Sequence, residues 1–387
     1  MKIFNWHFTS SKSAKTNTLK QYEDNKESRG LPSNAPFCLA PHTGMYFNQD
    51  GTVGACCYNR KDIFGKYPKQ TIDDIWKSMT RTHLCADLSN NHLRSGCNRC
   101  HNQFVSGNIG GMLATRYDYM WEYHLTNTQK DGDLSLLSPK TMEFEIGSVC
   151  NLECTMCSGY CSSAIRQNRD KLPPLISPYD EAFVDQLKPY IPHLIDAKFL
   201  GGEPFLNPLN FKIWDLFIEC HSKAVIAITT NGSILNERVK ETLGSLQNLY
   251  LTISIDSLNQ KNYESIRKNA KFKSVIQNIE WLIKNKYLHA LAVCPMVNNW
   301  ADMPEMVAYC NKHDLSIYFN TVFNPIELSI RSLSKADIQK ITYFLSSQKI
   351  DLEKNVPDRK SRENIDRYEG LIEQCKGWLN NKMVINA

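Results

Sequence analysis

Three cysteines with the spacing CxxxCxxC constrain this chain more than any other feature. Cys150, Cys154 and Cys157 stand in the run Cys-Asn-Leu-Glu-Cys-Thr-Met-Cys, directly after a strand-like stretch at 142–146. Cysteine thiolates are the usual protein ligands of iron–sulfur clusters. Three thiolates leave one iron of a four-iron cluster without a protein ligand, and an open coordination position separates a reactive metal site from a structural one. The spacing therefore indicates a reactive metal site, with half of a zinc site or a chance spacing as the alternatives.

A second motif follows the apolar run 197–200 and consists of Gly201, Gly202, Glu203 and Pro204. With both motifs present in this order, the chain resembles the radical S-adenosylmethionine (radical SAM) superfamily. In that superfamily CxxxCxxC follows the first strand of a barrel and GGEP follows the second. The resemblance covers roughly residues 140 to 325, and the order and structural context of the two motifs support it.

The resemblance implies two cofactors, a [4Fe–4S] cluster held by the three cysteines and SAM bound at its open iron. In the superfamily, an electron from the cluster cleaves SAM reductively, and the resulting 5′-deoxyadenosyl radical abstracts hydrogen from a substrate. The resemblance also implies an electron donor such as flavodoxin or ferredoxin. The cofactors carry the difficult chemistry, and the protein positions the reacting atoms and excludes water.

Composition indicates the compartment. Fourteen cysteines in 387 residues are many for a chain that begins without a long apolar signal region. Clustered cysteines without an export signal favour metal binding over disulfides, so a cytoplasmic protein is expected. No apolar run is long enough to span a bilayer, and no membrane association is expected. A net charge of +5 without a basic stripe predicts no nucleic-acid partner.

Changes in composition along the chain predict four segments. Residues 1–32 are polar and are interpreted as a loosely ordered tail. Residues 33–125 form a compact cysteine-bearing module, and a polar connector at 126–133 follows it. Residues 136–330 form the main domain, and 331–387 a helical segment that packs against it or closes its open end.

Six strand-like runs alternate with helical stretches in the main domain, which indicates βα units and a parallel sheet. The expected fold class is therefore α/β, a partial (β/α)6 TIM-like barrel, with a small N-terminal α+β cysteine-rich module. The superfamily resemblance implies the same barrel. The six runs are 142–146, 197–200, 224–229, 249–255, 290–297 and 316–323.

Polar residues alternate with apolar ones in two of these runs. Glu143 and Glu145 share one face of the first run, and Thr252, Ser254 and Asp256 share one face of the fourth. Parallel strands buried on both sides are apolar on both faces, so this pattern favours a barrel that encloses a polar cofactor. Glu145 is expected inside the barrel; for Glu143 an edge-exposed carboxylate is the alternative.

The resemblance also assigns SAM-binding residues, at the C-terminal ends of the strands where βα barrels hold their sites. Met156 stands where related enzymes carry an aromatic residue against adenine, and a thioether packs similarly. Ser257 stands where glycine often follows the fourth-strand motif in the superfamily. Arg267 resembles an arginine of related enzymes, with an arginine on the surface of a helix as the alternative. The expected SAM-binding set is Met156, Gly201, Gly202, Glu203, Pro204, Thr230, Asn231, Ser254 and Asp256.

A second cysteine group lies in the N-terminal module: Cys38, Cys56, Cys97 and Cys100. Together with Gly51 and the helical stretch 71–78, their spacing resembles the SPASM/twitch auxiliary-cluster modules of many radical SAM enzymes, although such modules usually follow the barrel. The resemblance implies a second, auxiliary [4Fe–4S] cluster. Structural zinc held by four thiolates is the rival, and Cys57 is the alternative to Cys56.

The other cysteines are expected to be buried small hydrophobic residues: Cys85, Cys161, Cys220, Cys294, Cys310 and Cys375. No catalytic residue is assigned. The candidates are Cys161, four residues beyond the cluster motif, Cys294 at the end of the fifth run, and Glu145.

An auxiliary cluster with all four irons ligated by protein suits a net oxidation, in which an electron leaves the substrate radical. A small-molecule or carbohydrate-like substrate is favoured, with a ribosomal peptide acted on by a maturase or epimerase as the alternative. Two other classes stay open: a zinc-stapled, non-enzymatic binding protein, and an enzyme acting on RNA. The RNA alternative needs a basic, aromatic-bearing surface that the sequence does not show.

Overall fold

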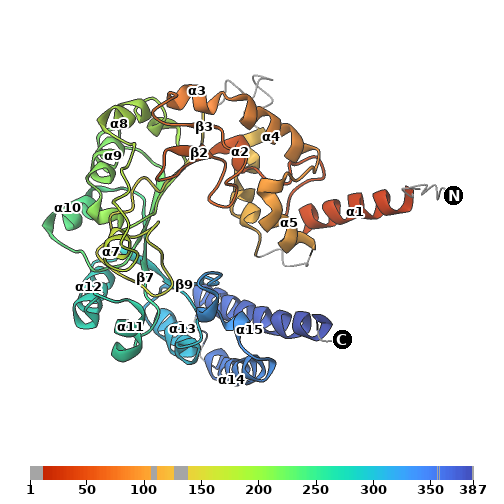
Figure 1. Cartoon of the computed structure of the whole chain (residues 1–387), viewed down its shortest axis with the longest axis vertical. Helices are drawn as coiled ribbons and strands as arrows, with labels where there is room; N and C mark the ends of the chain where they lie inside the picture. The colour runs from red at the N-terminus through yellow and green to blue at the C-terminus, as the bar shows by residue number, and fades with distance from the viewer. Residues whose placement is uncertain (1–11, 106–110, 126–137, 355, 357, 386–387) are drawn as a thin grey trace. The chain divides into compact units, whose positions relative to one another are not determined.

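The computed structural model describes residues 12–105, 111–125, 138–354, 356 and 358–385 (Figure 1). It divides into two compact units, residues 1–143 and 144–387, with the boundary inside strand β4 (Thr141–Phe144). The expected connector at 126–133 lies outside the described residues. The finer division at 1–32, 33–125, 136–330 and 331–387 stays a prediction.

The interpretation of 1–32 as loosely ordered is wrong for its described part, because residues Lys12–Ser28 form helix α1. Side-chain contacts at the end of α1 explain its order. Lys26 is buried and donates from Nζ to the carbonyl oxygen of Ser33 at 2.9 Å. Arg29 donates from Nε to Asp118 Oδ2 at 3.0 Å. The polar composition of residues 1–32 gave no sign of these contacts, because both partner residues lie beyond residue 32.

Unit 1 contains a small antiparallel sheet of β1 (Gly44–Phe47), β2 (Thr52–Gly54) and β3 (Gly65–Lys66). The helix expected at 71–78 is confirmed as α3 (Ile72–Trp76), where a capping box between Thr71 and Asp74 starts the helix. Other elements in the described part of the unit are α2 (Ala40–Thr43), α4 (Met79–Ser89), α5 (Asn98–Val105) and the 3₁₀ helices η1 (Ser95–Cys97) and η3 (Leu113–Met120). Unit 1 is thus α+β, as expected.

The core of unit 1 holds a histidine that it keeps neutral. His42 in α2 is 3 % exposed and packs its ring 4.8 Å from that of His124. Burial, together with the nearby charges of His124 and Arg81, lowers the pKa of His42 from 6.5 to about 3. Protonation of His42 therefore opposes folding.

We expect acid to destabilise the chain through His42. The unfolded state binds this proton below its pKa of 6.5, whereas the folded state does not until about pH 3. His42 therefore stabilises the fold fully above pH 6.5, and this contribution is lost at about 1.4 kcal/mol per pH unit as pH falls through that window. Urea unfolding of His42→Phe from pH 7 to pH 4 should show a shallower loss than the wild type. His193→Phe, at an exposed position, is the control; equal slopes in all three proteins would contradict the assignment.

All six expected strands form, with β4 at the unit boundary and the other five in unit 2, and the fold class is confirmed as a partial (β/α)6 barrel. β4 is followed in sheet order by β5 (Asp196–Phe199), β6 (Val225–Thr230), β7 (Leu249–Ser254), β8 (Leu288–Val293) and β9 (Ser316–Phe319). Strands β5 to β9 pair in parallel. Parallel neighbours place their C-terminal ends at one edge, so the loops that carry the expected motifs gather there.

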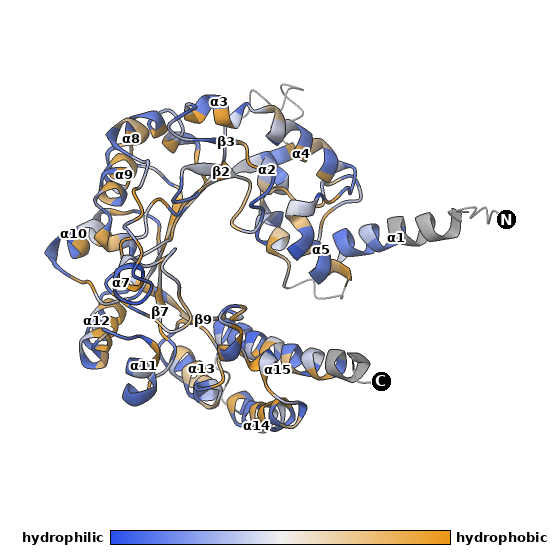
Figure 2. Cartoon of the chain, viewed as in Figure 1, coloured by the Kyte–Doolittle hydropathy of each residue, from blue (hydrophilic) through white to orange (hydrophobic). Residues whose placement is uncertain are grey.

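Helices between the strands lie along the outside of the sheet (Figure 1). Five of these helices, together with the first long helix after the last strand, are preceded by a Ser, Asn or Asp whose side chain accepts from a backbone N–H of the first turn, which satisfies an otherwise free donor. Figure 2 shows hydrophobic and hydrophilic residues side by side on α12 and α13, as expected of helices with one face on a core. The capped helices are α7 (Ser163–Asn168), α8 (Glu181–Leu187), α9 (Pro208–Glu219), α10 (Glu237–Ser245), α11 (Gln260–Ile266) and α14 (Lys335–Glu353). Uncapped by side chains are α12 (Phe272–Lys284) and α13 (Met303–Lys312).

The final helix, α15 (Arg359–Ile385), packs on β9. The Asn364 side chain accepts from the backbone N–H of Ile317 at 2.9 Å and donates to the carbonyl oxygen of Leu315 at 2.8 Å. The expectation that this segment packs against the barrel is therefore confirmed for α15.

Candidate active site and metal centres

The CxxxCxxC loop follows β4 and is fastened to the segment after β7 by its backbone. Glu153 donates its N–H to the carbonyl oxygen of Lys268 at 3.0 Å, and Thr155 to that of Ile266 at 2.8 Å. The start of α7 holds the other side, because Cys150 N donates to Ser163 Oγ at 3.1 Å. These contacts hold Cys150, Cys154 and Cys157 on one short loop at the C-terminal edge of the sheet.

Two of the three cysteine sulfurs have a nitrogen donor beside them. The Asn231 side-chain N–H points to Cys150 Sγ at 4.0 Å, and the Arg267 guanidinium lies 4.0 Å from Cys154 Sγ. Burial raises the pKa of Cys154 to about 11, and Arg267 partly offsets this rise. Without metal the thiol is therefore protonated at neutral pH, and metal binding must displace its proton.

Cys161 lies beside the third cysteine of the loop. Its hydrogen bond with the Cys157 thiol, followed by burial, raises the pKa of Cys157. Cys161 is half-buried and its N–H donates to the carbonyl oxygen of Ser158 at 3.0 Å. The sequence placed Cys161 near the motif but did not indicate this thiol-to-thiol contact.

The GGEP segment passes close against the cysteine loop. Gly201 and Gly202 both have positive φ, at 77° and 49°, and a side chain at Gly202 would collide with the carbonyl oxygen of Val149. Glycine is required here for the conformation and the close approach together. Glu203 N donates to that same Val149 oxygen at 2.7 Å, and the Glu145 side chain lies against Gly201.

Glu203 links GGEP to the turn after β6. It is 1 % exposed; Oε1 accepts from Thr230 Oγ1 at 2.6 Å and Oε2 from Asn231 N at 2.7 Å. Burial raises the pKa of Glu203, and these two donors oppose the rise. Glu203 was expected as an acceptor for SAM. In this structure its carboxylate oxygens face Thr230, Asn231 and Phe205 N, so its clearest task is to hold the two loops together.

Asp256 is buried completely and forms an ion pair with Arg267, with 2.8 Å between Oδ2 and Nε. Its Oδ1 accepts from Cys294 N at 2.8 Å. Burial lowers the pKa of Arg267, but the Asp256 carboxylate outweighs that effect and raises it above its ordinary value. The alternative of a surface helix arginine is wrong. Ser254 is half-buried at the end of β7, and Ser257 donates from Oγ to Asp302 Oδ2 at 2.5 Å.

An apolar cluster lies beside the cysteine loop. Met156 and Cys294 are partly buried and pack against the buried residues Ile266, Met296 and Val322. The structure therefore brings Met156, expected for packing on adenine, together with one candidate hydrogen donor. Cys85, Cys310 and Cys375 are buried as expected, whereas Cys220 is exposed, and its prediction is wrong.

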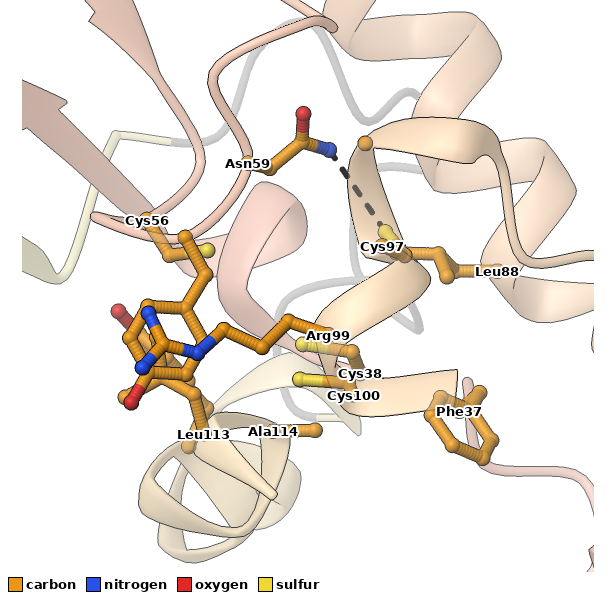
Figure 3. A pocket seen from close by; sticks show the side chains of 13 residues that line it. Phe37, Cys38, Cys56, Asn59, Leu88, Cys97, Arg99, Cys100, Leu113 and Ala114 are labelled. Carbon is orange, nitrogen blue, oxygen red and sulfur yellow. Dashed lines mark hydrogen bonds between the residues drawn. The ribbon is translucent and has the colours of Figure 1, made fainter. Parts of the chain in front are cut away.

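The second cysteine group surrounds one pocket in unit 1 (Figure 3). The sulfurs of Cys38, Cys56, Cys97 and Cys100 point into about 380 Å³ of empty space, part of it open to solvent. Burial and the neighbouring thiolates Cys56, Cys100 and Cys97 raise the pKa of Cys38 well above its ordinary value. Cys57 does not line this pocket, which distinguishes it from Cys56.

Several residues of this pocket were not predicted. Arg99 stacks 3.9 Å from the ring centre of Tyr58, and the Tyr117 hydroxyl donates to Glu143 Oε1 at 3.1 Å. Glu143 is therefore a hydrogen-bond acceptor within unit 1 and not a free edge carboxylate. Asn59 lies between the sheet and Cys97. Its position three residues after Cys56 was the only signal in the sequence.

The donor chemistry fits iron–sulfur clusters at both places. Three thiols share a glycine-cradled loop with a buried arginine, and four thiols face one pocket. In the described part of the chain, no three His, Cys, Asp or Glu side chains come close enough together to hold a single metal ion. Within the same ranges, no helix combines the length and apolar character needed to cross a membrane.

Comparison with known proteins defines the class. The radical SAM superfamily model matches residues 144–310, and the SPASM iron–sulfur cluster-binding domain matches 38–101. The chain therefore carries a radical SAM domain, with a SPASM iron–sulfur domain ahead of it. These domains imply SAM and [4Fe–4S] clusters as cofactors.

Curated relatives match over part of their length. The AdoMet-dependent heme synthase of Methanosarcina barkeri is 28% identical over 153 residues, 38% of this chain and 40% of the relative. A GTP 3′,8-cyclase of Synechocystis sp. is 25% identical over 158 residues, 41% of this chain and 45% of the relative. The match thus spans less than half the length of either relative.

Solved structures with a similar fold include anSMEcpe with bound AdoMet and SuiB of Streptococcus suis bound to S-adenosylmethionine. The first is 19% identical, covers 55% of this chain and 60% of its own, and has a TM-score of 0.42. The second is 15% identical, covers 63% of this chain and 55% of its own, and has a TM-score of 0.42.

Proposed function

We propose that the chain is a radical SAM oxidoreductase whose auxiliary [4Fe–4S] cluster binds in the four-cysteine pocket of unit 1. The observation that carries this proposal is the pocket itself, because Cys38, Cys56, Cys97 and Cys100 all turn their sulfurs into it. Four thiolates match the ligand number of a [4Fe–4S] cluster.

In unit 2, Cys150, Cys154 and Cys157 would hold the cluster that binds SAM. When both clusters and SAM are bound, they supply one-electron chemistry, which starts with hydrogen abstraction and ends with removal of an electron from the substrate. The protein's own residues keep the site in place. Glu203 ties the GGEP and 230–232 loops together, and Arg267 keeps a positive charge beside Cys154.

The proposed SAM-binding residues surround that loop: Met156, Gly201, Gly202, Glu203, Pro204, Thr230, Asn231, Ser254 and Asp256. Asp256 is fully buried against Arg267 and Cys294, so we propose that it acts by positioning Arg267. The substrate is proposed to be a small-molecule, carbohydrate-like or peptide group. Deuterium transfer from labelled candidates into 5′-deoxyadenosine identifies it directly.

Metal content tests the proposal. Anaerobic purification should give a brown protein with iron and sulfide for two [4Fe–4S] clusters. Zinc at both cysteine groups, with no sulfide, would instead support the non-enzymatic binding protein. Zinc in unit 1 alone, beside an iron–sulfur cluster in unit 2, would refute the auxiliary cluster while leaving the radical SAM class intact.

Replacing Cys97 with alanine should separate the two sites. We expect iron and sulfide to fall to the content of one cluster, while 5′-deoxyadenosine formation without substrate stays measurable. Turnover of the substrate identified by deuterium transfer should fall strongly, because one of four pocket thiols is lost. Cys57→Ala, next to Cys56 but outside the pocket, is the matched control and should retain both clusters. Unchanged turnover in Cys97→Ala would show that the pocket has only a structural role.

A further inference from the structure

We propose that Asn59 positions Cys97 and donates a hydrogen bond to its sulfur in the metal-bound state, and that this bond raises the reduction potential of the auxiliary cluster. The inference rests on the proposed cluster in unit 1. Asn59 is 3 % exposed and lines the four-cysteine pocket, although it is no metal ligand (Figure 3).

The orientation of the Asn59 amide is fixed by its own backbone neighbours. Oδ1 accepts from Asp62 N at 2.9 Å and from Lys61 N at 3.2 Å. Two N–H donors require the oxygen on that side, so the amide nitrogen must face the other way. There Nδ2 lies 3.6 Å from Cys97 Sγ and 2.9 Å from Asp62 Oδ2.

The residues on the Cys97 side of this contact are also closely packed. A side chain at Gly96 would collide with Asn59 Oδ1 and with Asp62 Oδ2, so the residue before Cys97 packs directly against Asn59. Asp62 is held in turn by Arg94, with 3.5 Å between Oδ1 and Nη1. The Cys97 sulfur therefore meets a donor whose direction is set from both sides.

Hydrogen bonds to cluster sulfurs are among the factors that set the reduction potential of an iron–sulfur cluster. A reduced cluster carries one more negative charge than an oxidised one. An N–H directed at a ligand sulfur stabilises the reduced state more than the oxidised state, so it raises the potential. In the described residues, Asn59 is the side-chain amide that directs an N–H at one of the four pocket sulfurs, which makes it the position to test.

The test isolates the auxiliary cluster by replacing Cys150, Cys154 and Cys157 with alanine in the full chain. In this background we compare Asn59 with Asn59→Leu, Asn59→Asp and Asn59→Gln. The reduction midpoint, followed by EPR during an anaerobic redox titration, should shift to lower potential in Leu and Asp, which lack the N–H donor. Gln keeps the amide and should recover part of the shift. Asn90→Leu, at an exposed amide of the same unit, is the matched control.

The outcomes separate this inference from the proposed function. A cluster that is retained with an unchanged midpoint in Leu overturns the role of Asn59 and leaves the auxiliary cluster standing. If the Asn59→Leu variant loses its iron, the Asn59→Asp variant provides the test, because its carboxylate still accepts from Asp62 N and Lys61 N. A reduction midpoint of Asn59→Asp at or above that of the parent protein overturns the inference. A parent protein that holds zinc without sulfide refutes the auxiliary cluster, and this inference with it.

Discussion

Replacing Cys154 with alanine should abolish iron binding at the 150–157 loop and all SAM cleavage. Only Cys150 and Cys157 would remain of the three thiols that we assign to this cluster, and the Arg267 guanidinium would lose the sulfur beside it. In anaerobically reconstituted protein, iron and sulfide should fall to the content of the auxiliary site alone. Formation of 5′-deoxyadenosine with dithionite should fall to background.

The matched control is Cys220→Ala, which removes an exposed cysteine at the end of α9. It should keep both clusters and full SAM cleavage, and so exclude a general effect of losing a thiol. Cleavage that persists in Cys154→Ala would refute the ligand assignment. Cys161→Ala adds a further comparison, because Cys161 contacts Cys157 but is not assigned as a ligand.

Replacing Arg267 with methionine should destabilise the protein strongly. Asp256 is fully buried, and Arg267 is its ion-pair partner at 2.8 Å. Removing one partner of a buried pair leaves an uncompensated charge and typically costs about 3–5 kcal/mol. Urea unfolding at pH 7 should therefore show a loss of this size in the metal-free protein, where cluster binding does not contribute.

A double-mutant cycle assigns that loss to the pair. Asp256→Asn combined with Arg267→Met removes both charges, and the double variant should be more stable than Arg267→Met alone. Lys188→Met, which removes an exposed positive charge, should change the free energy of unfolding by less than about 0.5 kcal/mol. A small effect of Arg267→Met would show that Asp256 is protonated and neutral in the fold.

The sequence was sufficient for the barrel because local patterns determine its strands. The run 249–255 is bounded by polar residues and alternates apolar with polar positions, and β7 forms at Leu249–Ser254. Gly202 could be placed beside the cysteine loop from its motif alone, and its positive φ and contact with Val149 explain why glycine stands there.

Residues whose role depends on partners distant in the chain could not be predicted from the sequence in the same way. Arg267 directly follows α11, whose polar Glu264 and exposed Ser265 resemble a solvated face, and nothing nearby in sequence indicates that Arg267 is buried against Asp256. The same holds for α1, where Arg29 depends on Asp118, 89 residues further along the chain. Asn59 is similar, since its contact with Cys97 exists only after the 94–97 turn packs against it. Local periodicity carries no information about such pairs.

The contact of Asn364 with β9 has a consequence for how the barrel ends. A last parallel strand leaves one row of backbone groups without a strand partner, and such an edge is a template for pairing with another molecule. The Asn364 amide occupies Ile317 N and Leu315 O, the same donor and acceptor that an added strand would use. One side chain on α15 thus takes the place of a neighbouring peptide unit at this edge of the sheet. The helix therefore opposes edge-to-edge association of the sheet in addition to packing on the barrel.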